Sequence, residues 1–153
     1  MRKDDTSRLT EALADLIWDM GARGLDGVCC TDLSLIEFQV LRRLDRAGHL
    51  SLQAVGADAC LTKSGATRLV DRLQERGFVE RERSTDDGRV CCVAATAAGR
   101  AALAAAREAF ASRLGRALAG LDETARTQLL AALPPLAAAV RRQGDGACCG
   151  PTC

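Results

Sequence analysis

Apolar residues recur at helical spacing along most of this chain of 153 residues. Near the N-terminus they fall at i, i+3 and i+4 intervals, which predicts an amphipathic helix with one apolar face. The glycine-punctuated segment 21–27 then predicts a loop that brings Cys29 and Cys30 to the start of the next element. The residues on the first apolar face are Leu9, Leu13, Leu16, Ile17 and Met20.

The next helix is predicted to begin with a capping box. Ser34 and Glu37 have the S-x-x-E spacing in which each side chain can satisfy a backbone N–H of the other residue. The apolar stripe of this helix continues up to Gly48. Its members are Leu35, Phe38, Leu41 and Leu44.

Two short helices with a tight join are predicted to follow. The first comes after Ser51, and the second runs from the N-cap Thr62 to about Arg76. Only Cys60 and Leu61 lie between them. Two short helices joined in this way form a helix-turn-helix.

A β-hairpin is predicted after the helix-turn-helix. Segments 78–83 and 89–94 flank a turn at 84–88, whose small and acidic residues tolerate turn geometry. We interpret this hairpin as the wing of a winged helix-turn-helix.

Two further helices are predicted beyond the hairpin. Thr96 can cap an alanine-rich helix that reaches about Leu118, and Asp122 can cap a last helix. The pair Pro134-Pro135 should kink or interrupt this last helix. Its apolar positions are Leu129, Leu130, Leu133, Leu136 and Val140.

These elements predict a mainly α-helical fold with a small β-wing. Residues 32–95 are expected to form a DNA-binding winged helix-turn-helix region. Residues 1–31 and 96–143 should form a helical dimerisation region, because their long apolar helices are hard to bury within one small domain. We therefore expect a symmetric homodimer in which residues 144–153 form a cysteine-rich C-terminal tail.

The overall charge does not by itself indicate a nucleic-acid partner. Lys and Arg number 21 against 20 Asp and Glu, a formal net charge of +1. Affinity for double-stranded operator DNA must then come from local clusters of basic side chains.

The predicted second helix of the helix-turn-helix supplies such a cluster in its first two turns. Hydroxyl groups and an exposed helix N-terminus suit phosphate contacts, whereas Arg68 can read guanine through two hydrogen bonds. Gly65 allows close backbone approach, and Arg89 at the wing tip suits a narrow minor groove, with Asp87 or Asp71 as its partner. The predicted DNA-binding residues are Thr62, Lys63, Ser64, Gly65, Thr67, Arg68, Arg72, Arg83 and Arg89.

The eight cysteines are a second chemical signal. The N-terminus lacks an apolar signal core, and no apolar run approaches the roughly 20 residues of a membrane-spanning helix. We therefore expect a cytosolic protein with no membrane partner, in which thiols stay reduced and serve as metal or redox ligands. Cys60 is predicted to be a small core residue, and Cys91 and Cys92 should point to opposite faces of a strand.

The remaining cysteines can form an all-sulfur site. Cys29 and Cys30 precede a helix N-terminus, which lowers thiol pKa. The tail adds three thiols, enough for a trigonal or tetrahedral site with Cys29, Cys30, Cys148, Cys149 and Cys153. Such ligands favour As(III), Sb(III), Hg(II), Cd(II) or Cu(I), and no organic cofactor is predicted. Whether Cys60, Cys91 or Cys92 takes part stays open.

The order of these motifs resembles the MarR family of transcriptional regulators, from Leu9 to Arg142. The most specific parts are segments 61–73, 83–89 and 96–99. The resemblance implies a dimeric winged-helix repressor that binds a pseudo-palindromic operator and releases it when a small molecule, metal or oxidant binds. Gly88 stands where the family often has a second basic residue, which leaves the wing contacts to Arg83 and Arg89. Zinc-responsive members would imply Glu37 and Glu108 as oxygen ligands beside Cys30.

The leading hypothesis is a repressor released when a thiophilic metal or metalloid binds the cysteine thiolates. The alternative is a repressor in which oxidation forms a disulfide between the same loop and tail. A thiol-disulfide enzyme fits poorly, because Cys149 and Cys153 have C-x-x-x-C spacing and no catalytic motif appears elsewhere. We therefore predict that the protein is not an enzyme.

Overall fold

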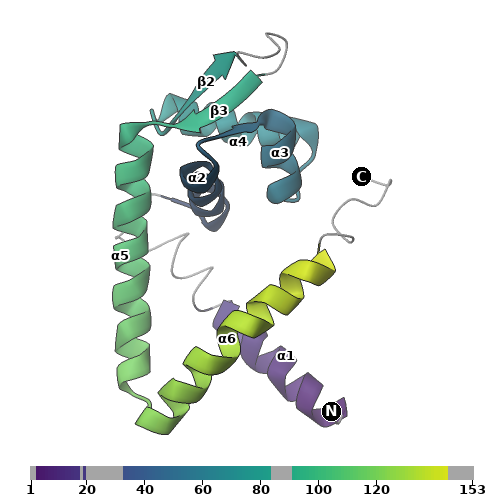
Figure 1. Ribbon diagram of the computed structural model, residues 1–153, viewed down its shortest axis with the longest axis vertical. Helices are drawn as coiled ribbons and strands as arrows, with labels where there is room; N and C mark the ends of the chain where they lie inside the picture. The colour runs from purple at the N-terminus through teal and green to yellow at the C-terminus, as the bar shows by residue number, and fades with distance from the viewer. Residues whose placement is uncertain (1–2, 18, 20–32, 84–90, 145–153) are drawn as a thin grey trace.

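A computed structural model of the chain describes residues 3–17, 19, 33–83 and 91–144 (Figure 1). The predicted mainly helical fold with a small β-wing is confirmed. The elements are α1 (Lys3–Ile17), α2 (Leu35–Ala47), β1 (His49–Ser51), α3 (Leu52–Asp58), α4 (Lys63–Glu75), β2 (Val79–Arg83), β3 (Cys91–Ala95), α5 (Ala97–Ala119) and α6 (Glu123–Gly144).

The helices begin where short polar side chains can cap them. Each N-cap side chain accepts a hydrogen bond from the backbone N–H three residues further along the chain, which satisfies one otherwise unpaired donor. At α2 the predicted capping box is complete, since Glu37 also accepts from the backbone of the cap. These N-caps are Ser34, Ser51, Thr62, Thr96 and Asp122.

The strands form a three-stranded antiparallel sheet in the order β1-β3-β2. The two wing strands were predicted, and Val93 in β3 is paired with Arg81 of β2 and Leu50 of β1. Strand β1 was missed because it spans three residues, too few for an alternating pattern to be visible. It joins the wing to the start of α3.

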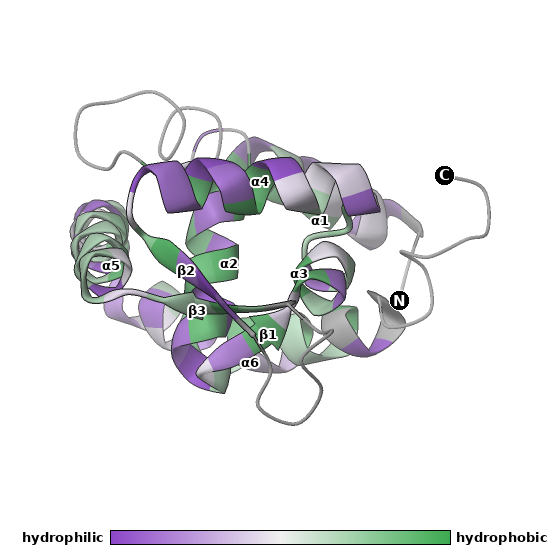
Figure 2. Ribbon diagram, turned by 90° about the horizontal axis from the view of Figure 1, so that it is seen from above, coloured by the Kyte–Doolittle hydropathy of each residue, from purple (hydrophilic) through white to green (hydrophobic). Residues whose placement is uncertain are grey.

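The buried apolar residues of the described segments form one core inside a head made of α2, α3, α4, the sheet and the first turns of α5. Figure 2 looks onto this head from above, with α4 on one side of it and the sheet on the other. Its buried residues are Leu33, Val40, Leu41, Leu44, Val55, Leu69, Val70, Leu73, Val79, Val93, Ala95, Leu103 and Ala106.

An ion pair on the surface of the head joins α2 to α3. The Arg43 guanidinium donates to both carboxylate oxygens of Asp58, over 2.8 and 3.0 Å. The hydrogen bond and the charge of Asp58 raise the pKa of Arg43. Because both side chains are partly exposed, solvent screens the pair and its contribution to stability is small.

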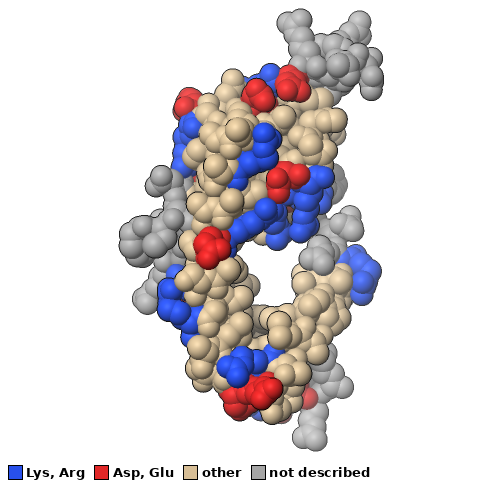
Figure 3. Space-filling model, turned by 60° about the vertical axis from the view of Figure 1, so that its left-hand side comes forward, with Lys and Arg blue, Asp and Glu red and all other residues tan. Residues whose placement is uncertain are grey.

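Helices α1 and α6 lie outside the head. In Figure 1, α5 runs away from the head, and α6 turns back from the far end of α5 and crosses α1 in this view. We call α1 and α6 the arm. Figure 3 shows an opening between the head and the arm. The apolar side chains of both helices are exposed, up to 66% for Ile17 and 72% for Leu130. Leu35, predicted in the core stripe of α2, is also 40% exposed. The exposed apolar side chains of α1 and α6, called here the arm surface, are Leu9, Leu13, Leu16, Ile17, Leu129, Leu130, Leu133, Leu136 and Val140.

Pro134-Pro135 was predicted to kink or interrupt the last helix, and the interruption does not occur. Helix α6 continues through both prolines to Gly144. The two missing N–H donors leave carbonyl groups without intrahelical partners. The side chains around them are exposed, so water can hydrogen-bond to those carbonyls at little cost.

The prediction that Cys60 is a core residue was also wrong. Cys60 is exposed and adopts a left-handed backbone conformation with φ of 51°. This conformation turns its side chain outward, while the neighbouring Ala59 and Leu61 pack against the core.

In the described parts of the chain, no helix is long and apolar enough to cross a membrane.

Candidate nucleic-acid interface

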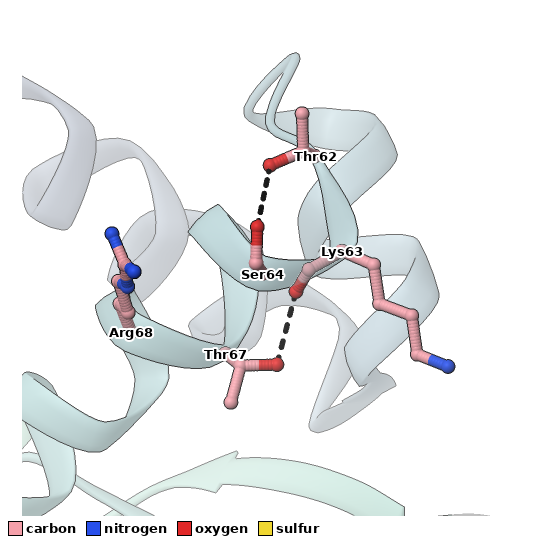
Figure 4. Close-up of a pocket in the computed structure, with 5 residues that line it drawn as sticks. All are labelled: Thr62, Lys63, Ser64, Thr67 and Arg68. Carbon is pink, nitrogen blue, oxygen red and sulfur yellow. Dashed lines mark hydrogen bonds between the residues drawn. The ribbon is translucent and has the colours of Figure 1, made fainter. Parts of the chain in front are cut away.

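The N-terminal half of α4 borders an open hollow on the surface of the head. Five residues line it, all from the cap and first two turns of the helix (Figure 4). All five are among the predicted DNA-binding residues, so the fold presents them together on one surface. They are Thr62, Lys63, Ser64, Thr67 and Arg68, and together they are called here the α4 hollow.

The hydroxyl groups of the α4 hollow have defined roles. Thr62 Oγ1 accepts from Gly65 N over 3.2 Å and lies 3.2 Å from Ser64 Oγ. If Thr62 donates to Ser64, the Ser64 hydroxyl proton remains free for a phosphate oxygen. Thr67 Oγ1 donates to the Lys63 carbonyl over 2.9 Å, so it can donate to a phosphate only after rotating.

The two cations of the α4 hollow extend to opposite sides of it. Figure 4 shows Lys63 and Arg68 pointing away from each other, and both are exposed. Within the described ranges, neither has an ion-pair partner. Their charge is therefore available to an anionic ligand that covers the N-terminus of α4.

Gly65 lies beside the N-cap of α4 and is partly buried. A Cβ at this position would lie 3.3 Å from Thr62 Oγ1 and 3.5 Å from Leu61 Cβ. The first contact is tight, so a methyl group here would crowd the cap as well as any ligand over the α4 hollow.

Arg72, also predicted to bind DNA, lies two turns further along α4 than Ser64. Its Nε atom is 3.1 Å from Glu37 Oε1, and its side chain is 60% exposed. Arg76 reaches the other oxygen of the same carboxylate. Glu37 was named as a possible oxygen ligand beside Cys30; in the structure its carboxylate binds Ser34, Arg72 and Arg76.

The wing strand β2 is connected to α4 through Arg81. Its guanidinium forms an ion pair with Asp71 and donates to Gln74 Oε1 over 3.0 Å. Asp71 was one of the two partners predicted for Arg89, the other being Asp87; in the structure Asp71 pairs with Arg81. The link from Arg81 to α4 was not predicted, although its partners lie only 7 and 10 residues away. The ion pairs of Glu37 with Arg72 and Arg76 were not predicted because they join α2 to α4, and Arg76 lies 39 residues from Glu37.

Several predicted site residues lie outside the described residues. They include Arg89 and all five cysteines of the expected sulfur site, while Arg83 ends β2 without a described side chain. Among the described residues, no group of three or more His, Cys, Asp or Glu is placed to hold a metal ion. Cys91 and Cys92 are consecutive residues of β3, as predicted, and Cys92 is partly buried.

Basic side chains lie over the head beside acidic ones (Figure 3).

Residues 33–91, from the start of the head to β3, match the profile of the MarR family. This segment therefore resembles the winged helix of that family. Solved structures of similar fold also cover the helices outside this segment, since they match 88–90% of the chain.

Three known proteins illustrate the likeness. The uncharacterised HTH-type transcriptional regulator YkoM of Bacillus subtilis is 32% identical over 97 residues, 63% of each chain. The match thus spans less than two thirds of that relative. A probable transcriptional regulator from Pseudomonas aeruginosa is 28% identical, with TM-score 0.60 over 88% of this chain and 99% of its own. Streptococcus pneumoniae FabT, solved in complex with DNA, has TM-score 0.72 at 20% identity over 90% of this chain and 99% of its own, a likeness of fold.

Proposed function

We propose that the protein is a homodimeric transcriptional repressor that binds a pseudo-palindromic DNA operator through α4 and the wing. The observation that carries this proposal is the α4 hollow, where hydroxyl groups and a helix N-terminus lie between two cations that have no ion-pair partner among the described residues. Phosphates bind well at such a helix end, because its N–H groups and dipole favour an anion.

The chemistry of the α4 hollow divides into two tasks. Lys63 and the hydroxyl groups suit phosphate oxygens, which orient the protein but do not identify a base. Arg68 is the residue suited to base reading, since its guanidinium can donate two hydrogen bonds to guanine in the major groove. FabT, whose fold is similar, was solved bound to DNA, which supports the same use of this fold here.

The arm surface supports the dimer. Leu130 is 72% exposed and Val140 60% exposed, which is costly in water and unnecessary if a second chain covers them. A symmetric dimer would present two copies of α4 to successive turns of the major groove, roughly 34 Å apart. Any change in that spacing weakens simultaneous binding of both half-sites.

We further propose that a thiophilic metal or metalloid ion, such as As(III), acts as the effector. Cys29, Cys30, Cys148, Cys149 and Cys153 offer soft thiolate ligands. The described residues contain no competing cluster of metal ligands, and Glu37 is already bound within the head. Ion binding between the loop before α2 and the tail would shift the heads and release the operator.

Fluorescence anisotropy of the reduced protein on DNA from its own promoter tests the proposal. The complex is titrated separately with As(III), Sb(III), Hg(II), Cd(II), Cu(I), Zn(II) and peroxide. Release by a soft ion at near-stoichiometric amounts supports the metal effector. Release only by peroxide, reversed by a thiol reductant, would replace it with a redox switch. Equal affinity for promoter and unrelated DNA would contradict operator binding itself.

A further inference from the structure

We propose that Glu37 is the positioning residue of the recognition helix α4. Its carboxylate fixes the orientation of α4 through Arg72 and Arg76, and the affinity for the operator depends on this charge. The inference rests on the proposed DNA-binding function and deepens it, because it assigns recognition to a residue that is not itself placed to touch DNA.

Four donors converge on the Glu37 carboxylate. Oε2 accepts from Ser34 N over 2.8 Å and from Ser34 Oγ over 3.0 Å. From α4, Arg72 Nε lies 3.1 Å from Oε1, and Arg76 Nη1 lies 3.4 Å from Oε2. Oε2 is thus shared between the N-terminus of α2 and Arg76, while Oε1 faces Arg72.

The carboxylate is buried and Arg76 is 28% exposed, whereas Arg72 is 60% exposed and its contact is more strongly screened. Glu37 is 3% exposed and is the one buried charged residue in the described part of the chain. A buried carboxylate is costly unless cations and hydrogen-bond donors compensate it, so Arg72 and Arg76 are held to it. The Arg76 guanidinium also lies 4.6 Å from the centre of the Phe78 ring, which restricts it further.

The position of these arginines along α4 connects Glu37 to the α4 hollow. Ser64, Arg68, Arg72 and Arg76 follow one another at intervals of four residues and so form one ridge of the helix. Glu37 holds the two C-terminal members of the ridge, and the two N-terminal members line the α4 hollow. Fixing one end of the ridge sets the rotation of α4 about its axis and hence the direction of Arg68.

The second connection of α4 is weaker. Arg81 of β2 reaches Asp71, but these side chains are 30% and 44% exposed, so solvent screens their attraction. The Glu37 side chain is only 4% exposed, so it is the more buried of the two carboxylates in these ion pairs.

The substitution Glu37→Gln separates this role from capping. Glutamine can accept the backbone hydrogen bond of a capping box as glutamate does, so the N-terminus of α2 is retained. The ion pairs to Arg72 and Arg76 are lost. Asp58→Asn is the matched control, because it also removes one negative charge and one inter-helix ion pair, here to Arg43 between α2 and α3.

The experiment measures Kd of the full-length reduced wild type, E37Q and D58N for the operator duplex and for a shuffled duplex of equal length. Circular dichroism and urea unfolding establish the folded fraction of each protein. We expect E37Q to bind the operator about tenfold more weakly, because the orientation of the base-reading face is no longer fixed. Its affinity for the shuffled duplex should be unchanged or slightly higher, since a negative charge is removed. D58N should match the wild type on the operator.

Three results would overturn the inference. Folded E37Q could bind the operator as tightly as the wild type, lose affinity for both duplexes equally, or behave like D58N. A wild type that does not distinguish operator from shuffled DNA is a separate outcome, which contradicts the proposed function instead. If E37Q does not fold, the same measurements are made on Arg76→Gln. Arg76 contacts Glu37 and lies outside the α4 hollow. Unchanged operator binding by R76Q would then overturn the inference.

Discussion

The backbone of Gly99 packs directly against the carbonyl group of Phe78, so closely that a Cβ on Gly99 would lie 2.0 Å from that oxygen. Thr96 joins the same two segments: its N–H donates to Phe78 O over 3.1 Å, and its hydroxyl donates to Gly77 O over 2.6 Å. The Thr96 hydroxyl also caps α5 by accepting from Gly99 N. Helix α5 thereby starts at a fixed position beside the end of α4 and the start of the wing.

Replacement of Gly99 by alanine should disrupt this junction. The added methyl group meets backbone, which cannot move aside without displacing α5, and we expect a loss of about 3 kcal/mol in the free energy of unfolding. Gly115→Ala on the same helix is the control, because no atom lies within 4 Å of its would-be Cβ. That variant should gain about 1 kcal/mol from helix propensity. Urea unfolding compares them; equal stability of the two variants would contradict the contact.

Arg68 and Lys63 should affect DNA binding in different ways. Arg68→Ala is expected to cost about 1–3 kcal/mol on the operator and to relax the preference at one base pair, since a bidentate contact reads that base. Lys63→Ala should weaken operator and shuffled DNA alike and reduce the slope of log Kd against log salt concentration by about 1. Anisotropy at several salt concentrations measures both effects. Identical behaviour of the two variants would exclude this division of tasks.

Gly65→Ala tests close approach of DNA to α4. Alanine favours the helix by about 1 kcal/mol, but its methyl group meets Thr62 Oγ1 at 3.3 Å, so stability should change little. If the DNA backbone lies against this residue, operator affinity falls while the urea midpoint stays near that of the wild type. Unchanged operator affinity would show that DNA does not contact residue 65.

Leu130→Glu tests the arm surface. Because Leu130 is 72% exposed in the single chain, the substitution should leave the head folded. A charge buried against a second chain is costly, so the variant should dissociate to monomers and lose most of its operator affinity. Sedimentation velocity reports the mass, with Gln128→Glu on the same helix as the control. A variant that remains dimeric would place the subunit contact elsewhere.

Deletion of the tail from Gly146 onward tests the effector proposal. The head and the arm surface are retained, so operator binding should match that of the full chain. The response to a soft ion should disappear, because Cys148, Cys149 and Cys153 are removed. Anisotropy in the presence and absence of the ion measures both properties. A truncated protein that still releases DNA normally would rule out the tail as a ligand source.

Local signals accounted for most of the secondary structure. A cap at Ser34, Thr62, Thr96 or Asp122 depends on a residue three positions away, so the sequence alone shows where each helix begins. The α4 hollow follows from the same signals, because its residues are consecutive turns of one helix. Strand β1 was not predicted, because a strand of three residues is defined by its pairing with β3 and is too short to show an alternation of apolar and polar residues.

By itself, the sequence determined the order of the helices, their capped starts and the group of residues on the first turns of α4, since these follow from interactions within a few residues. Only the tertiary structure decided that Cys60 points outward, that α6 continues through its prolines, and that Glu37 binds Arg72 and Arg76. The bond from Arg76 to Glu37 joins residues 39 positions apart. Such a contact depends on how α2 and α4 pack across the core, which no local pattern specifies.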